Sequence, residues 1–490
     1  MNTQTIKQQW FGNVKNDVLS GMVVAMALIP EAIAFSIIAG VDPMVGLYAS
    51  FCIAVVISFT GGRPAMISAA TGATALLMGT LVKEHGLEYL LAATILTGIL
   101  QFILGALRVG QFMKFVPRSV MIGFVNALAI LIFTAQLPHF DGQGWEMYAM
   151  VAGSLAIIYI LPRFTKAVPA PLIAIIIMTI VAITTGAPLK TVGDMGELAN
   201  TLPVFLLPDI PLNFETLQII FPISIAIAFV GLLESLLTSQ IVDDMTDTPS
   251  DKNKEARGQG IANVVSGFFG GMAGCAMIGQ SVINVSSGGR GRLSTFVAGV
   301  FLMLLIIVFN DILVQIPMGV LVGIMFMVSI GTFDWGSLAR FHKTPISDTA
   351  VMIITVITVV STDNLSIGVL VGVLLSAIFF VAKISKVHIE EAFNSDTRTM
   401  VYTVTGQIFF ASIDSLMNQI EFNVDADYVV LDFTDSHVWD DSAVAAIDKL
   451  VLKFNEHDKE TKITGLNKDS SQLVKRLAVH HKHSTSISDH

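Results

Sequence analysis

The chain has 490 residues, of which 53% are apolar and only 13% are charged. Because soluble proteins carry about 25% charged residues, this composition excludes an ordinary soluble protein and predicts a membrane protein. The net charge of −10 argues against a nucleic-acid-binding protein and against a basic arm that grips anionic lipid. The two cysteines, Cys52 and Cys275, lie in apolar stretches, which excludes a disulfide framework and a cysteine-rich zinc site.

Charge is unevenly distributed along the chain. Residues 1–385 hold 39 charged side chains, about 10% of that part, whereas residues 386–490 hold 27, about 26% of that part. This difference predicts a transmembrane domain over 1–385 and a soluble domain over 386–490.

Apolar runs that suit membrane-spanning helices recur from Val18 to Ala382. A spanning helix needs about 20 apolar residues. The first run is too long for a signal peptide and has no A-x-A cleavage site, so we expect it to be a retained helix. Eleven runs are clear: 18–38, 43–60, 87–107, 118–136, 146–162, 168–185, 216–242, 293–310, 312–333, 346–361 and 364–382. Three are short and rich in Gly, Ala, Ser and Thr: 66–82, 258–273 and 275–287.

The loops between these runs predict the topology. If all fourteen segments cross the membrane and the amino terminus is cytoplasmic, 16 Lys and Arg side chains face the cytoplasm, and only Lys83 and Lys190 face the other side. Cytoplasmic loops carry such an excess of Lys and Arg. If one weak segment did not cross the membrane, every later loop would change sides and the excess would be lost. We therefore predict a multi-pass protein of the cell membrane with both termini in the cytoplasm.

Two of the weak segments, the third and the tenth, occupy corresponding positions if the chain consists of two seven-segment halves. They follow the small-residue strings from Gly61 to Ser68 and from Gly270 to Gly279. Interrupted segments at matching places in two halves indicate half-helices that meet at a substrate site near the bilayer midplane. The alternative is that the small residues serve only close helix packing.

Two acidic residues, Glu31 in the first segment and Glu234 in the eighth, lie within apolar runs. Such a residue costs roughly 2.5 to 3.5 kcal/mol on insertion scales, so it is a candidate functional group. Two carboxylates in one dry cavity repel each other and favour binding of a proton or Na⁺. Thr238 lies one turn after Glu234 and could add a hydroxyl oxygen to a cation site. The alternative is that each Glu lies near a helix end or makes a structural hydrogen bond.

The membrane block contains no H-E-x-x-H, G-x-S-x-G or P-loop motif and no cluster of His and Asp. We therefore expect that the protein is not an enzyme.

The soluble tail has a different periodicity. It predicts strands over 400–410 and 428–433 and a short strand around Ile463, with helices near 442–456 and 470–479. This alternation is typical of a small α/β domain.

Several motifs together resemble the SulP family of anion transporters. They are Pro30-Glu31-Ala32-Ile33-Ala34-Phe35, Ala39-Gly40-Val41-Asp42-Pro43, Gly46-Leu47-Tyr48, Ile67-Ser68 with Thr71-Gly72, Gly258-Gln259-Gly260-Ile261-Ala262-Asn263, and Ser287-Gly288-Gly289-Arg290-Gly291-Arg292-Leu293. The resemblance implies an α-helical polytopic membrane protein with fourteen segments in a 7+7 inverted repeat, half-helices three and ten facing each other, and a small α/β STAS domain. It also implies an elevator-like motion of a core domain against a scaffold domain, and we expect a homodimer in the lipid membrane. In the tail, Asp441 stands where STAS domains of anti-sigma factor antagonists have a phosphorylated Ser.

The same resemblance implies site residues. The anion pocket would use Phe35, Gly72, Ala73, Thr74, Ala276, Met277, Ile278, Gly279 and Gln280. A coupling ion, Na⁺ or H⁺, would use Glu234, Thr238 and Glu31, with no resident metal and no other cofactor. The chain departs from the family at three positions: Ile278 replaces a Na⁺-binding Thr of bicarbonate members, Glu31 replaces a Gln common in animal members, and Gln280 replaces their Arg.

The expected function is secondary active transport of a small inorganic oxyanion, bicarbonate or sulfate. One alternative is a non-transporting anion sensor or motor that acts through the STAS domain, and another is a dicarboxylate or nucleobase symporter of the same fold. Because Gln280 has replaced an Arg while Glu31 and Glu234 are negative, we expect a monoanion such as bicarbonate to fit better than divalent sulfate.

Overall fold

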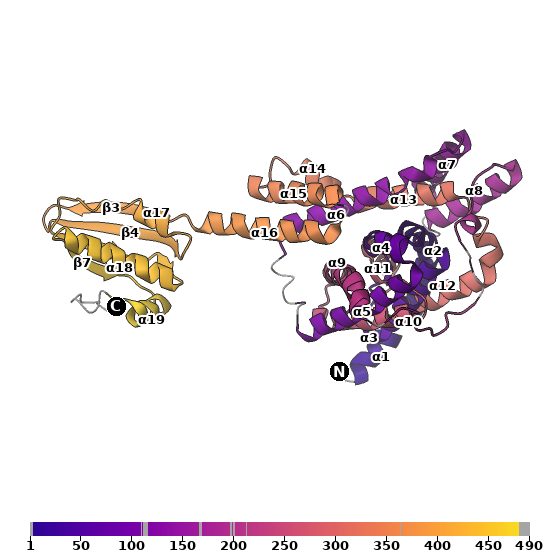
Figure 1. Ribbon diagram of the computed structural model, residues 1–490, viewed down its shortest axis with the longest axis horizontal. Helices are drawn as coiled ribbons and strands as arrows, with labels where there is room; N and C mark the ends of the chain where they lie inside the picture. Colours follow the sequence, from indigo (N-terminus) through magenta and orange to yellow (C-terminus); the bar gives the residue numbers. More distant parts are fainter. Residues whose placement is uncertain are drawn as a thin grey trace. The chain divides into compact units, whose positions relative to one another are not determined.

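The computed structural model describes residues 3–108, 110, 116–165, 169–196, 198, 201–211, 213–362 and 364–479. The chain divides into two compact units, Met1–Val373 and Leu374–His490 (Figure 1). This division falls within the last helix of the apolar block, so the boundary expected between residues 385 and 386 stays a prediction.

The first unit is helical, apart from two short strands. The first half of the chain contributes α1 (Thr3–Phe11), α2 (Val14–Ala39), α3 (Pro43–Thr60), β1 (Ser68–Ala70), α4 (Gly72–His85), α5 (Leu87–Ala106), α6 (Arg118–Thr134), α7 (Trp145–Ile160) and α8 (Ala170–Thr185), with short 3₁₀ turns η2 (Leu137–Phe140), η3 (Leu161–Arg163) and η4 (Val192–Asp194). The second half contributes α9 (Phe214–Thr246), α10 (Lys252–Phe268), β2 (Gly274–Ala276), α11 (Ile278–Ser286), α12 (Arg292–Leu313), α13 (Met318–Thr332), α14 (Trp335–Ala339), α15 (Ile346–Thr362) and the first part of α16 (Leu365–Ile384).

Several helix contacts in the first unit recur between the corresponding helices of the other half. The contact of α5 with α10 corresponds to that of α12 with α3, and the contact of α2 with α12 corresponds to that of α9 with α5. Helix α6 packs on α15 as α13 packs on α7. This pattern confirms the predicted architecture of two corresponding halves.

The lengths of the helices agree with membrane spans. Among the described residues, eight helices are long and apolar enough to cross a bilayer, and α8, α13 and α15 are shorter apolar helices. The predicted segment 312–333 starts later, at Met318, because Pro317 precedes the first turn as its N-cap. Segments three and ten each consist of a strand followed by a short helix, β1 with α4 and β2 with α11, so the prediction of interrupted helices is confirmed.

The second unit is an α/β domain with its own apolar core. Strands β3 (His388–Asn394), β4 (Thr399–Ile408), β5 (Tyr428–Asp432) and β7 (Glu460–Thr464) form a sheet in the order β3-β4-β5-β7, and β6 (Ser436–Val438) pairs with β4. Helices α17 (Ile413–Met417), α18 (Asp441–Glu456) and α19 (Lys468–Leu477) complete the domain. The three predicted strands and two predicted helices are confirmed. Strands β3 and β6 were not predicted, since β3 is mostly exposed and β6 has only three residues.

Candidate functional site

Two short antiparallel strands join the two halves of the membrane unit. Ser68 of β1 pairs with Ala276 of β2, and Ala70 pairs with Gly274. Helix α4 begins at Gly72 and α11 begins at Ile278, directly after these strands. The strand pair therefore holds both half-helices by their amino-terminal ends.

The first turns of α4 and α11 have no side-chain caps. Thr71 and Met277, the residues before them, have extended backbones, and neither side chain bonds to the first turn's amides. The amino terminus of a helix leaves amide donors unpaired and carries about half a positive charge. Two such ends beside one strand pair can bind an anion through the backbone.

The surroundings of these first turns differ. A Cβ atom at Gly72 would lie 2.9 Å from Cε1 of Phe35, so the aromatic ring packs on the start of α4. A Cβ atom at Gly279 would have nothing within 4 Å, and this residue is exposed. The backbone at the start of α11 is therefore open to a small ligand.

Buried side-chain amides form hydrogen bonds that hold the strand pair in place. Asn263 of α10 accepts a hydrogen bond from the Gly274 amide at 2.9 Å and donates to the Gly274 carbonyl at 3.0 Å. The same side chain donates to Oε1 of Gln101 at 2.8 Å. Thr74 donates to the Ala273 carbonyl at 2.8 Å, which ties α4 to the segment before β2. The position of the half-helices is thus fixed by fully buried polar contacts.

Glu234 of α9 is buried beside this strand pair. The thiol of Cys275 donates to its Oε2 atom over 3.0 Å, and the Cys275 sulfur lies 3.1 Å from Oγ1 of Thr71. The carboxyl is therefore linked through Cys275 to the residue that precedes α4. The hydroxyl of Thr238, which was predicted as a cation ligand, donates its proton to the backbone carbonyl of Glu234 in the same helix over 2.7 Å.

Glu31 of α2 contacts the other half-helix. Nε2 of Gln280, the third residue of α11, donates to Oε1 of Glu31 over 2.7 Å. Both carboxyl groups are buried, and neither forms an ion pair among the described residues. One acidic side chain is therefore linked to the start of each half-helix.

All the predicted site residues lie on α2, on α9, on the strand pair, in the first turns of the half-helices or, for Met277, directly before α11. They are Phe35, Gly72, Ala73, Thr74, Ala276, Met277, Ile278, Gly279 and Gln280 for the anion, and Glu31, Glu234 and Thr238 for the coupling ion. The link from Glu234 to Cys275, and from Cys275 to Thr71, was not predicted, because a thiol in an apolar run gives no signal of its partner.

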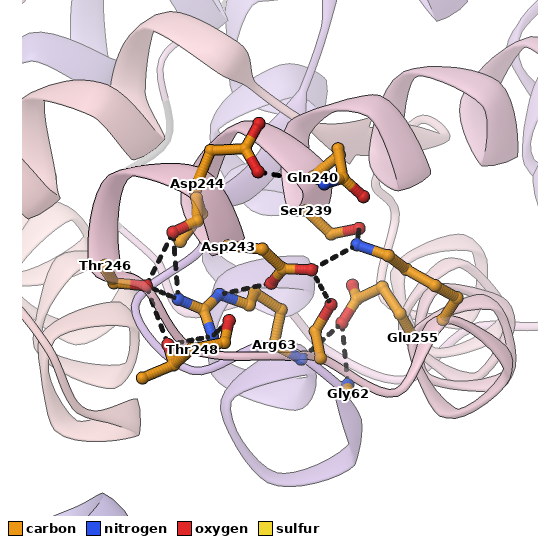
Figure 2. Close-up of polar contacts among 12 residues, drawn as sticks. Gly62, Arg63, Ser239, Gln240, Asp243, Asp244, Thr246, Thr248 and Glu255 are labelled. Atoms are coloured by element: carbon orange, nitrogen blue, oxygen red, sulfur yellow. Dashed lines mark hydrogen bonds and ion pairs between the residues drawn. The ribbon is translucent and has the colours of Figure 1, made fainter.

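A buried ionic cluster fixes the chain just before β1. Figure 2 shows the guanidinium of Arg63 enclosed by the end of α9. Its Nε atom lies 3.3 Å from Oδ1 of Asp243, and its other nitrogens donate to Val242, Thr246 and Thr248. From the sequence, Arg63 was predicted only as a loop charge, since its partners lie about 180 positions away.

Helix α10 completes this cluster (Figure 2). Lys252 donates to Oδ2 of Asp243 over 2.7 Å. Oε2 of Glu255 accepts hydrogen bonds from the amides of Gly62 and Arg63 at 2.7 and 3.0 Å. The segment that leads into the first half-helix is thus tied to α9 and α10, the helices that carry Glu234 and support β2.

Comparison with known protein families identifies the family of this chain. The sulfate permease family matches residues 14–149 and 143–355. The chain belongs to the sulfate permease family. Residues 390–489 match the STAS domain, which confirms the resemblance of the tail.

Known proteins match three quarters or more of this sulfate permease chain. It is 65% identical to YbaR of Bacillus subtilis (strain 168) over 477 residues, which cover 97% of this chain and all of YbaR. A structure titled the transmembrane domain of a cyanobacterium bicarbonate transporter BicA is 27% identical, with a TM-score of 0.66, and the match covers 75% of this chain and 98% of that domain. The murine Slc26a9 anion transporter in the inward-facing state is 15% identical, with a TM-score of 0.82 over 96% of this chain and 88% of its own, which shows the shared fold. The protein is thus a multi-pass membrane protein of a transporter family.

Proposed function

We propose that the protein is a secondary active transporter that carries a small inorganic oxyanion, with bicarbonate preferred over sulfate, and that a proton is the coupling ion. The observation that carries this proposal is the strand pair β1–β2, which presents two uncapped helix amino termini with a buried carboxyl linked to each. The amide groups would bind the anion, and the carboxyl groups would take up the cation that moves with it.

The charge of the site favours a monoanion. Two half-helix ends together supply about one positive charge, and Gln280 adds none, because its side-chain amide is neutral. Two unit charges 4 Å apart interact by about 4 kcal/mol at an effective dielectric of about 20. A second negative charge on the ligand would therefore be opposed by Glu31 or Glu234 without a matching cation.

The contacts of Glu234 favour a proton over Na⁺. Sodium needs several oxygen ligands, whereas the side-chain partner of this carboxyl among the described residues is the thiol of Cys275. Ile278 presents an apolar side chain at the start of α11. A proton needs only the carboxyl oxygen itself, so it is compatible with these neighbours.

The names of the similar proteins and of the family point to two substrates, bicarbonate and sulfate. The similar structure at 27% identity is titled a bicarbonate transporter, and the matching family is described as sulfate permease. We further propose that both termini lie in the cytoplasm, as the loop charges predict, and that the protein works as a homodimer.

Uptake by proteoliposomes tests this function. The purified protein, reconstituted into sealed liposomes, should accumulate labelled bicarbonate when the outside is acidic, and a Na⁺ gradient at equal pH should have no effect. Empty liposomes correct for leakage of carbon dioxide. Accumulation driven by Na⁺ alone would refute proton coupling, and the absence of uptake for every anion of a panel would refute transport.

A further inference from the structure

A polar cavity lies away from the half-helices, between the amino-terminal ends of α6 and α15 and the segment after α14. Its volume is about 290 Å³, and it is lined by Arg118, Ser119, Ser337, Arg340, Lys343 and Asp348, among others. Since a water molecule takes about 30 Å³ of liquid volume, the cavity can hold a group much larger than a single water.

The cavity has an excess of positive charge. Arg340 forms an ion pair with Asp334 at 3.2 Å. Arg118 and Lys343 make no side-chain hydrogen bond or ion pair with another described residue. Asp348 is the single acidic residue of the lining. Because Arg340 is paired with Asp334, Arg118 and Lys343 face this one carboxylate, and the cavity keeps an excess of one positive charge.

Backbone and hydroxyl donors add to this charge. The amino terminus of α6 has no side-chain cap, and α15 begins at Ile346, next to the same cavity. Oγ of Ser119 is shielded from solvent and has no hydrogen-bond partner within the described ranges. A buried hydroxyl without a partner is costly, so this atom is free to donate to an acceptor that enters the cavity.

Exposed apolar side chains lie close in the chain to residues that line the cavity, namely Ser337 and Pro345. The side chains of Trp335 and Leu338 on α14 are 59% and 48% exposed, and that of Ile346 is 89% exposed. Tryptophan is enriched at the interface between membrane and water, where acyl chains begin. Large exposed apolar side chains beside a cationic cavity fit a ligand that has both a phosphate and acyl chains.

We propose that this cavity binds the phosphate group of an anionic membrane lipid. Arg118 and Lys343 pair with the phosphate, the hydroxyl of Ser119 donates to it, and the acyl chains lie along Trp335, Leu338 and Ile346. Basic pockets between membrane helices bind anionic headgroups in this way. A bound lipid would join α6 to α15, two helices that already pack on each other.

Native mass spectrometry of the full chain tests the proposal. In neutral detergent, the protein should retain phosphatidylglycerol in preference to phosphatidylcholine. Because each cation near the membrane surface contributes about 1 kcal/mol, or about fivefold, the double variant Arg118→Gln/Lys343→Gln should bind phosphatidylglycerol more than tenfold more weakly. Arg163→Gln, which removes an exposed cation outside this cavity, serves as the matched control and should bind as the native protein does.

A stability control and competition by soluble phosphates complete the test. Thermal unfolding without added lipid should be unchanged in the double variant; if that variant unfolds, Lys343→Gln alone should still lose about fivefold in affinity. Glycerol 3-phosphate and inorganic phosphate should compete only weakly with the lipid. Equal phosphatidylglycerol binding by the folded double variant and the native protein would overturn the proposal. Binding of glycerol 3-phosphate as tight as that of the lipid would overturn the lipid as the source of the phosphate.

Discussion

Gln280 and Glu31 form a hydrogen bond of 2.7 Å that joins the third residue of α11 to the middle of α2. The two residues are 249 positions apart. This bond places a neutral amide between the first turn of a half-helix and a buried carboxyl. The charge that a bound anion meets at this half-helix therefore depends on the residue at position 280.

Gln280→Arg should shift selectivity towards divalent sulfate. The new cation would neutralise Glu31 and leave the site one positive charge higher, so sulfate should gain about tenfold over bicarbonate in competition, which corresponds to 1.4 kcal/mol. The measurement is inhibition of labelled bicarbonate uptake by unlabelled sulfate. Gln280→Met, which removes the hydrogen bond without adding charge, is the control. If sulfate already displaces bicarbonate better than bicarbonate itself does in the native protein, the charge argument is wrong.

Cys275 should act through its hydrogen bond to Glu234. Cys275→Ser keeps a donor at the same place and should retain most gradient-driven uptake. Cys275→Ala removes a hydrogen bond worth about 1 kcal/mol and should lower the uptake rate about fivefold. Rates are compared at equal amounts of reconstituted protein. Equal rates in the Ala and Ser variants would show that this contact has no part in coupling.

Two glycines of the candidate site should respond differently to the same change. In Gly274→Ala, the new methyl group would collide with the carbonyl oxygen of Ala69 in the partner strand. Such overpacking typically costs about 1–3 kcal/mol, so the melting temperature in detergent should fall. Gly279→Ala has open space at that atom, so its melting temperature should stay unchanged while anion binding weakens. Equal stability of the two variants would contradict the close approach of β1 and β2.

Arg63 should be necessary for stability because its guanidinium binds several groups of α9 at once. Lysine cannot reproduce this fork, and disruption of a buried ion pair costs about 3–5 kcal/mol. Arg63→Lys should therefore lower the melting temperature strongly. Arg340→Lys alters an ion pair that is half-exposed and should cost less than about 1 kcal/mol. Similar melting temperatures of the two variants would refute the structural role of the Arg63 cluster.

The sequence predicted the architecture well because membrane segments leave a local signal. Apolar runs gave the segments, and the glycine-rich strings before residues 72 and 278 marked the interrupted helices. Glu31 and Glu234 stood out because a carboxyl is rare in an apolar run.

Contacts between distant segments could not be predicted in this way. The bonds from Cys275 to Glu234 and from Arg63 to Asp243 depend on how α9 packs beside β1 and β2, and no periodicity encodes that packing. Thr238 illustrates the same limit. Its spacing from Glu234 predicts a shared ion site, and that role stays a prediction, while the bond from its hydroxyl to the Glu234 carbonyl was not predicted.

The most direct test of coupling is uptake of labelled bicarbonate by proteoliposomes that contain Glu234→Gln. The amide keeps the shape of the side chain but cannot take up a proton, so the account predicts that accumulation driven by an acidic exterior is lost while labelled anion still binds. Glu84→Gln, at an exposed glutamate near the end of α4, should accumulate bicarbonate as the native protein does. Unchanged accumulation in a folded Glu234→Gln protein would contradict the account.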